Sequence, residues 1–244
     1  MTPEGAFEPT VMFFGLTNSP ATFQMMMNEL LRDLINTGKV VVFIDNMIVG
    51  MESNEGHDEL VTEVIRKLEE NDLYMKLEKC KWKVKEVGFL GVVIGPEEIK
   101  MEEEKLKDVL DWLTSKCVKD VQKFLRLVNY YRRFIKGFVS ITRPLHNMAK
   151  KDQKWDWTER QEKEFRELKG QFTKELVLAV LDLDKKMRME VDMSNYTTGG
   201  MLSIECEDGL WRLVAFLSKS LNETERNYEI HNKEMLAIIR ELEN

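Results

Sequence analysis

The chain has 244 residues, of which 43% are hydrophobic and 32% charged, and its formal net charge is −7. These values are ordinary for a globular protein, and no apolar run approaches the roughly 20 residues that cross a bilayer. Three scattered cysteines without a CxxC pair, and three histidines without ligand spacing, indicate neither a disulfide framework nor a zinc site. The amino terminus lacks the basic-then-apolar layout of a signal peptide. We therefore expect an intracellular protein, in the cytoplasm or the nucleus.

The chain opens with patterns for a helix and a hairpin. Ser19 is suited to the N-cap of a helix, and Pro20 to its first helical position. Two apolar runs follow at 40–44 and 47–49, and Asp45-Asn46 separates them. Two residues of this kind between two apolar runs predict a hairpin with Asp45-Asn46 as its loop.

A second helix and a further strand are predicted next. Residues 56–73 have the spacing of an amphipathic helix, with Leu60, Val64 and Leu68 on one face. Residues 87–95 are apolar and punctuated by glycine, as in a short strand or hairpin arm. The order helix, hairpin, helix, strand indicates an α+β fold, with a sheet covered by helices on one side.

After Pro96 the pattern becomes mostly helical. Residues 102–113 are acidic and amphipathic, and 118–138 carry an apolar stripe at helical spacing, made of Val121, Leu125, Val128, Tyr131 and Ile135. Pro144 and the polar stretch 150–157 suggest a boundary. Thr158 and Gln161 then predict a capping box at the start of another helix.

The last part returns to strands. Met187, Met189 and Val191 alternate with Arg188, Glu190 and Asp192, which predicts a strand with its charged side chains on one face. Residues 199–205 and 211–218 are further strand candidates. Residues 232–243 predict a helix with an apolar stripe of Met235, Ile238 and Leu242. Three strands and one helix are an incomplete domain.

Basic residues gather in one segment despite the negative net charge. From Lys116 to Lys151 there are ten lysines and arginines and one acidic residue, Asp120. Such a block attracts phosphate backbones, although charge alone favours a solvated helix face.

Six stretches, taken together and in this order, resemble one family. They are 13–31 (FFGLTNSPATFQMMMNELL), 41–50 (VVFIDNMIVG), 88–94 (GFLGVVI), 127–145 (LVNYYRRFIKGFVSITRPL), 177–203 and 216–238. The chain from about residue 8 onward resembles the reverse transcriptase–RNase H part of the Pol polyprotein of Ty3/gypsy-type long-terminal-repeat retrotransposons. One such motif alone would be weak, but six in series are specific.

The resemblance implies an α+β fold with four parts. Residues 1–95 would be the C-terminal part of a reverse transcriptase palm without fingers, and 96–150 a helical thumb. Residues 151–185 would be a connection, and 186–244 the N-terminal half of an RNase H-like α/β domain.

The resemblance also implies two-metal nucleotidyl transfer, which needs several carboxylates around two Mg²⁺ ions, with Mn²⁺ as an alternative. Asp45 matches the first aspartate of the family's palm hairpin, but Asn46 replaces the second. An amide has no charge, and a further aspartate of the family would lie on an upstream strand that the chain lacks. We expect Mg²⁺ to bind weakly or not at all, and this copy to be inactive alone.

The pair Asp45-Asn46 also has a purely structural interpretation. Asp and Asn both tolerate left-handed backbone and favour two-residue hairpin loops. Taken alone, the decapeptide favours a plain turn, and the surrounding motifs favour an inherited ligand position at Asp45.

Further polymerase positions follow from the resemblance. Phe14 and Gly15 match a segment beside the incoming nucleotide, where glycine lets the backbone approach closely. Phe89, Leu90 and Gly91 match a hairpin that positions the primer end. Arg132 and Arg133 match the thumb helix that follows the template–primer backbone, whereas Tyr131 is better explained as a core residue.

In the RNase H part, Asp192 and Glu234 match the aspartate of the first strand and the glutamate of the first helix. Both would be metal ligands and catalytic residues. Without the match, Glu234 is an ordinary surface glutamate. The family's further aspartates would lie beyond Asn244, and so this cluster is also short of ligands.

Two functions from different classes fit these observations. The first is a reverse transcriptase/RNase H fragment whose RNA-directed DNA polymerisation and RNA cleavage are lost or impaired. The second is a non-catalytic, domesticated remnant that binds nucleic acid or a protein. The implied partners are an RNA–DNA hybrid or template–primer duplex and, by family, a dNTP; no membrane is implied, and the sequence does not indicate an oligomeric state.

Overall fold

The computed structural model describes residues 12, 15–51, 54–150, 154–174 and 176–243. They divide into two compact units, Met1–Lys83 and Val84–Asn244, which are described separately. Among the described residues, no helix has the length and apolar character needed to cross a membrane. Packing thus divides the chain after Lys83. The family domains inferred above are defined differently, and their boundaries stay predictions.

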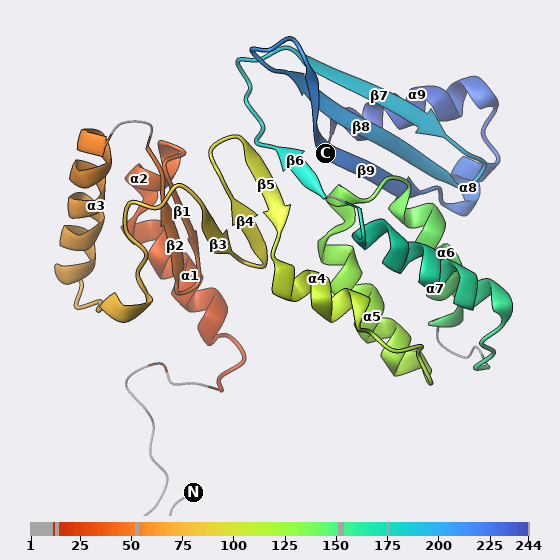
Figure 1. Cartoon of the computed structure of the whole chain (residues 1–244), viewed down its shortest axis with the longest axis horizontal. Coiled ribbons are helices and arrows are strands. Elements are labelled where there is room, and N and C mark those ends of the chain that lie inside the picture. Colours follow the sequence, from red (N-terminus) through yellow and green to blue (C-terminus); the bar gives the residue numbers. More distant parts are fainter. Residues whose placement is uncertain (1–11, 13–14, 52–53, 151–153, 175, 244) are drawn as a thin grey trace, which may run out of the picture. The chain divides into compact units, whose positions relative to one another are not determined.

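The first unit combines helices with one hairpin (Figure 1). Its elements are α1 Ser19–Leu30, α2 Arg32–Asn36, β1 Val40–Phe43, β2 Asn46–Val49, α3 Asn54–Glu69 and the short 3₁₀ helix η1 Leu77–Lys79. The core consists of Met27, Leu31, Val40, Val64 and Leu68. The predicted helices and hairpin are confirmed. The N-cap of α1 is Asn18, however, and Ser19 is already helical.

The prediction for the loop of the first hairpin is wrong by one residue. Phe43 pairs with Asn46, so the loop is Ile44-Asp45 and Asn46 begins β2. Ile44 has φ +53°, a left-handed conformation that is unusual for a β-branched residue. The side chain of Gln24 stabilises it, because its Oε1 atom accepts the Ile44 N–H at 2.5 Å. A tertiary hydrogen bond thus overrides the local preference for Asn in the turn.

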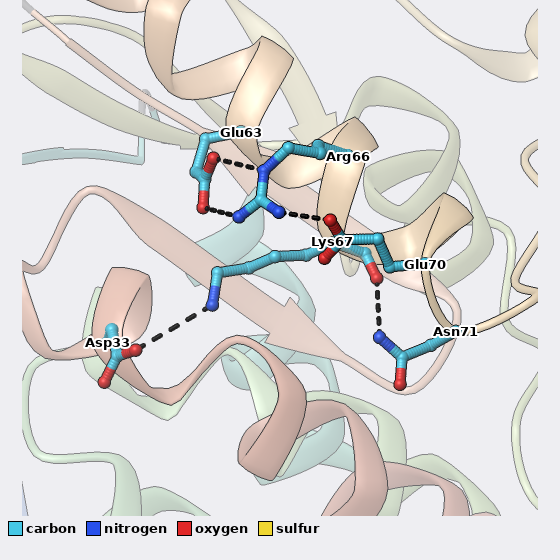
Figure 2. A network of polar contacts seen from close by, with 6 residues as sticks. All are labelled: Asp33, Glu63, Arg66, Lys67, Glu70 and Asn71. Carbon is cyan, nitrogen blue, oxygen red and sulfur yellow. Dashed lines mark hydrogen bonds and ion pairs between the residues drawn. The ribbon is translucent and has the colours of Figure 1, made fainter.

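Charged side chains fasten the C-terminal half of α3 (Figure 2). The guanidinium of Arg66 bonds both carboxylate oxygens of Glu63, at 2.9 and 2.7 Å, and also reaches Glu70. These carboxylates raise the pKa of Arg66, so that it stays charged. Lys67 lies 3.8 Å from Asp33 and so joins α3 to α2. Most of these side chains are exposed, so each ion pair adds little to stability.

The second unit contains two antiparallel sheets and a group of helices (Figure 1). Its strands are β3 Val87–Phe89, β4 Val92–Ile94, β5 Glu98–Met101, β6 Val177–Ala179, β7 Met187–Met193, β8 Thr197–Glu205 and β9 Trp211–Ser220. Its helices are α4 Glu103–Leu110, α5 Val118–Tyr130, η2 Arg132–Phe134, α6 Phe138–Met148, α7 Glu159–Phe172, α8 Glu223–Arg226 and α9 Ile230–Leu242. The sheet orders are β3-β4-β5-β6 and β7-β8-β9.

The core of the second unit contains the apolar stripe predicted for 118–138. All five of its members are buried, with exposed fractions of at most 4%: Val121, Leu125, Val128, Tyr131 and Ile135. The predicted capping box of α7 is also present, since the Thr158 Oγ1 atom accepts the Arg160 N–H and the Thr158 N–H reaches Gln161.

Two features of the second unit were not predicted. Pro144 is buried inside α6 and does not end that helix, which runs to Met148; the boundary suggested by Pro144 together with residues 150–157 stays a prediction. The stripe of Met235, Ile238 and Leu242 on α9 is exposed, and α9 buries Ala237 and Glu241 instead. The helix packs on β7 and β8. The face with Ala237 and Glu241 is turned to the sheet, where Gly200 of β8 leaves room for the Glu241 side chain.

Candidate nucleic-acid and metal sites

Asp45 lies at the exposed tip of the first hairpin. Its Oδ1 atom accepts a hydrogen bond of 3.3 Å from the side-chain amide of Asn46. An aspartate at the position of Asn46 would add a second carboxylate, whereas the amide donates a hydrogen bond to the first. Phe14 lies outside the described residues. Gly15 has φ +103°, a backbone conformation that only glycine adopts readily.

Gln24 is a residue at this hairpin that sequence reasoning missed. Besides accepting the Ile44 N–H, its side-chain amide donates to the carbonyl of Val42 at 3.2 Å and to Asn28 Oδ1 at 2.7 Å. One side chain of α1 thus holds the end of β1 and the first residue of the turn that carries Asp45. The sequence signal was the pair Gln24 and Asn28, polar residues four apart on either side of three methionines.

The hairpin of β3 and β4 turns at Leu90-Gly91, because Phe89 pairs with Val92. Both loop residues have positive φ, +52° and +84°, as a two-residue type I′ turn requires. The structure therefore places Phe89, Leu90 and Gly91 at one hairpin tip, as the resemblance implies.

Two tyrosines from the end of α5 hold this tip. The hydroxyl of Tyr130 donates to the carbonyl of Leu90, and that of Tyr131 donates to the carbonyl of Gly91 at 3.0 Å. Burial raises the pKa of Tyr131 to about 12, so it remains a donor throughout the physiological range. A Cβ atom on Gly91 would lie 2.7 Å from the Tyr131 hydroxyl. Tyr131 is a core residue, as predicted, and also positions the hairpin.

The two arginines assigned to the thumb have different surroundings. Arg132 is half-buried, and its guanidinium donates to the carbonyl of Ser218 in β9. The hydroxyl of Ser218 in turn accepts the Val139 N–H at 3.2 Å. Arg133 is exposed. Arg132 thus joins η2 to the second sheet, and Arg133 is the more accessible of the two for a phosphate.

The two acids matched to an RNase H site are both exposed. Asp192 lies near the end of β7, where its Oδ1 atom accepts the Met193 N–H at 2.8 Å. It pairs with Gly199, whereas the neighbouring pair, Val191 and Gly200, faces Glu241 of α9. Side chains alternate along a strand, so Asp192 lies on the other face of the sheet. Glu234 is on α9.

The described residues do not fit a two-metal site. Asp45 is on the hairpin of the first unit, and Asp192 and Glu234 are on β7 and α9 of the second. In the described part of the chain, no three His, Cys, Asp or Glu residues are grouped so that they could hold a metal ion. One carboxylate does not hold two Mg²⁺ ions against their hydration. The ligand roles assigned to the three acids stay predictions.

A cavity of about 780 Å³ opens in the second unit between α6, the start of α7 and the turn that joins β7 to β8. Its charged lining residues are Arg143, Lys150, Lys154, Arg160, Asp156 and Glu164. Among the described residues, none of the four cations forms an ion pair. The guanidinium of Arg143 stacks 3.8 Å from the ring centre of Tyr196.

This cavity was only partly foreseen. The basic block predicted Arg143 and Lys150, but Arg160 and Tyr196 come from distant parts of the sequence. A cavity with excess positive charge and an aromatic ring is chemically suited to phosphate groups and to a base or ribose beside them.

Two family models match the chain. Residues 2–94 match the reverse transcriptase (RNA-dependent DNA polymerase) family, and residues 157–244 match the RNase H-like domain found in reverse transcriptase. Curated relatives include the Tf2-7 and Tf2-3 transposon polyproteins of Schizosaccharomyces pombe, each 33% identical over 240 residues. The match covers 98% of this chain and 18% of each relative, so the chain spans about a fifth of their length.

Solved structures share the fold. A foamy viral protease-reverse transcriptase in complex with an RNA/DNA hybrid has a TM-score of 0.77 and 22% identity, over 96% of this chain and 31% of that chain. The same protein in complex with dsDNA gives 0.76 and 21%, over 94% and 47%. The α+β fold predicted from the sequence is confirmed. The chain belongs to the reverse transcriptase and RNase H-like family of Ty3/gypsy-type retrotransposon polyproteins.

Proposed function

We propose that this chain binds nucleic acid, as an RNA–DNA hybrid or template–primer duplex, and that it lacks two-metal catalysis on its own. The observation that carries the proposal is the cavity with four cations and no ion pair among its described lining residues. The family's activities are RNA-directed DNA polymerisation and cleavage of RNA in hybrids, with divalent metals such as Mg²⁺. Binding of a dNTP is implied by the family alone.

Charge and shape support binding more than turnover. Positive side chains attract the backbone through counterion release, which needs no metal and no close geometry. Catalysis needs several carboxylates within a few ångströms, and the described residues offer no such group. The foamy viral proteins with the same fold are held in complexes with an RNA/DNA hybrid and with dsDNA, which agrees with a duplex as ligand.

Binding is tested by fluorescence anisotropy of a labelled RNA–DNA hybrid at several salt concentrations. Replacing both Lys150 and Lys154 with alanine should weaken binding and reduce the slope of log K against log salt by about two, one for each lost phosphate contact. The matched control replaces Lys85 and Lys107, two exposed lysines outside the cavity, and should leave the slope unchanged. Equal effects from both pairs would show that binding depends on the total positive charge of the chain, and would contradict the cavity as the binding site.

Catalysis is tested on the same protein by primer extension and hybrid cleavage with Mg²⁺ or Mn²⁺. We expect no turnover above the background of a mock purification. Activity that Asp45→Ala or Asp192→Ala abolishes would instead establish an active enzyme fragment. Binding without turnover supports the non-catalytic function.

A further inference from the structure

Arg143 and Tyr196 form a stacked pair on the wall of the cavity in the second unit. The guanidinium carbon of Arg143, in α6, lies 3.8 Å from the ring centre of Tyr196, in the turn between β7 and β8. Both side chains line the cavity. This cation–π contact orients the planar guanidinium through one of its faces, and the other face stays available for a second flat group.

Hydrogen bonds hold the turn of Tyr196 in place beside α6. The Leu221 N–H donates to the carbonyl of Tyr196 at 2.8 Å. The hydroxyl of Thr197, a residue that is 6% exposed, lies 3.0 Å from the hydroxyl of Ser140. Ser140 is three residues before Arg143 on α6, so the turn is joined to the helix next to the stacked pair. The pair is therefore ordered before a ligand binds, which lowers the entropic cost of binding.

The lining of the cavity contains charges of both signs. Lys150, Lys154 and Arg160 supply the positive charge that attracts phosphate groups. Asp156 and Glu164 supply carboxylates, which repel phosphate but accept hydrogen bonds from the amino groups of bases. The lining therefore suits a whole nucleotide, with its base and its phosphate, better than a phosphate backbone alone.

The cavity is large enough for a nucleotide, but the base must be accessible to enter it. The volume of about 780 Å³ lies within the range of roughly 300–1,000 Å³ that is usual for small-molecule sites. Inside a duplex each base is stacked between its neighbours and paired, so its extrusion costs free energy. For a base that is already single-stranded this cost is small. The expected ligand is thus an unpaired nucleotide.

We propose that the cavity binds one unpaired nucleotide next to the double-stranded part of a hybrid. Its base stacks on the outer face of the Arg143 guanidinium, so that the cation lies between the base and the ring of Tyr196. Bases stack on guanidinium planes as they do on aromatic rings. The phosphate of the same nucleotide lies at Lys150 and Lys154. This inference rests on the proposed function, because it names the part of the nucleic acid that occupies the cavity.

Fluorescence anisotropy with three labelled hybrids tests the inference without any mutation. All share one double-stranded part: the first is blunt, the second has a three-nucleotide overhang that begins with adenine, and the third has an abasic site in place of that adenine. The two overhangs carry the same charge, so their difference isolates the base. We expect the intact overhang to bind about tenfold more tightly, the scale of one stacked base. Equal affinities, or tighter binding of the abasic overhang, at both 3′ and 5′ ends would overturn the inference.

Arg143→Lys tests the stacked pair, because it keeps the charge and removes the planar group. The preference for the intact overhang should fall from about tenfold to about twofold or less. The matched control is Arg126→Lys, at an exposed arginine of α5 outside this cavity, and the variant should keep the preference. An unchanged preference in Arg143→Lys would contradict the assigned stack.

The same measurements separate this inference from the proposed function. If the proposed function fails, the salt dependence of the blunt hybrid does not respond to the replacement of Lys150 and Lys154. If this inference alone fails, that response remains and the intact and abasic overhangs bind equally. Circular dichroism confirms that each variant is folded.

Discussion

The hydroxyl of Tyr131 donates a 3.0 Å hydrogen bond to the carbonyl oxygen of Gly91, and so joins the end of α5 to the tip of the β3–β4 hairpin. Tyr131 is 2% exposed, so water does not replace the bond when it is lost. Its neighbour Tyr130 makes the equivalent bond to Leu90 but is 55% exposed. The two tyrosines thus make the same kind of hydrogen bond at a buried and at an exposed site, and each serves as the control for the other.

Tyr131→Phe should lower the free energy of unfolding by about 1 kcal/mol, since it removes a buried hydrogen bond and leaves the Gly91 carbonyl with only the Glu102 N–H as partner. Tyr130→Phe should change it by less than half as much, because solvent reaches that site. Urea denaturation of both variants measures the difference. Equal effects would show that burial does not set the strength of these bonds.

Gly91→Ala should destabilise the second unit more than Gly209→Ala does. Both glycines have positive φ, +84° and +74°, so alanine costs about 1 kcal/mol of backbone strain at either position. At Gly91 the new Cβ also lies 2.7 Å from the Tyr131 hydroxyl, whereas no atom lies within 4 Å of a Cβ at Gly209. The difference in Tm between the two variants measures the destabilisation caused by the steric clash at Gly91. Combining Gly91→Ala with Tyr131→Phe should recover part of the loss.

Gln24→Ala should destabilise the first unit by about 1 to 3 kcal/mol, because it removes the partners of Val42 and Ile44 at once. Asn28→Ala removes a single exposed contact of the same side chain and should cost much less. Hydrogen exchange at the Ile44 amide reports the effect directly, and it should accelerate in Gln24→Ala alone. An unchanged exchange rate would mean that the turn is held by the strands.

Glu241→Gln should stabilise the protein at pH 7 by about 1 kcal/mol, the scale of an unsatisfied buried polar group. Glu241 is 2% exposed, and among the described residues its Oε2 atom has no hydrogen-bond partner, although the Thr198 hydroxyl lies nearby. Burial raises the pKa of Glu241 against the opposing effects of Thr198 and of the cations Lys219, Arg132 and Arg240.

The pH dependence follows from that direction. A carboxyl group whose pKa is raised in the folded state stabilises the fold below its unfolded pKa, about 4.3, and loses that contribution as the pH rises through the folded pKa. The advantage of Glu241→Gln should therefore shrink as the pH falls from 7 toward 4.3. Urea denaturation at several pH values measures it, and a constant difference would contradict the assignment.

The sequence predicted the elements with strong periodicity. The stripe from Val121 to Ile135 is buried as its spacing requires, and from Arg188 to Asp192 the charged side chains are exposed while Met189 and Val191 are partly buried; Met187, at the start of the strand, is exposed. The capping box at Thr158 is equally local, and it forms as expected. In these segments the local sequence is enough to predict the element and its buried face, because side chains recur on one face with the period of the helix or the strand.

Features decided by distant residues could not be predicted. Gln24 moves the first turn by one residue, and a glycine in β8 lets α9 bury Glu241 in place of its apolar stripe. The cavity of the second unit depends on Tyr196 and Arg160 meeting across separate elements. Pro144 is buried inside α6, although proline lacks the backbone donor that a helix interior uses. Each of these depends on a contact that spacing along the chain does not encode.

The bond from Arg132 to Ser218 spans 86 residues, whereas that from Tyr131 to Gly91 spans 40. Closing the larger loop costs more entropy before any contact is gained, so the hairpin anchor should form ahead of the link between η2 and β9. During synthesis on the ribosome, β9 emerges well after η2 and α6, the helices that it contacts. The second sheet is thus the last part of this unit to acquire its native neighbours.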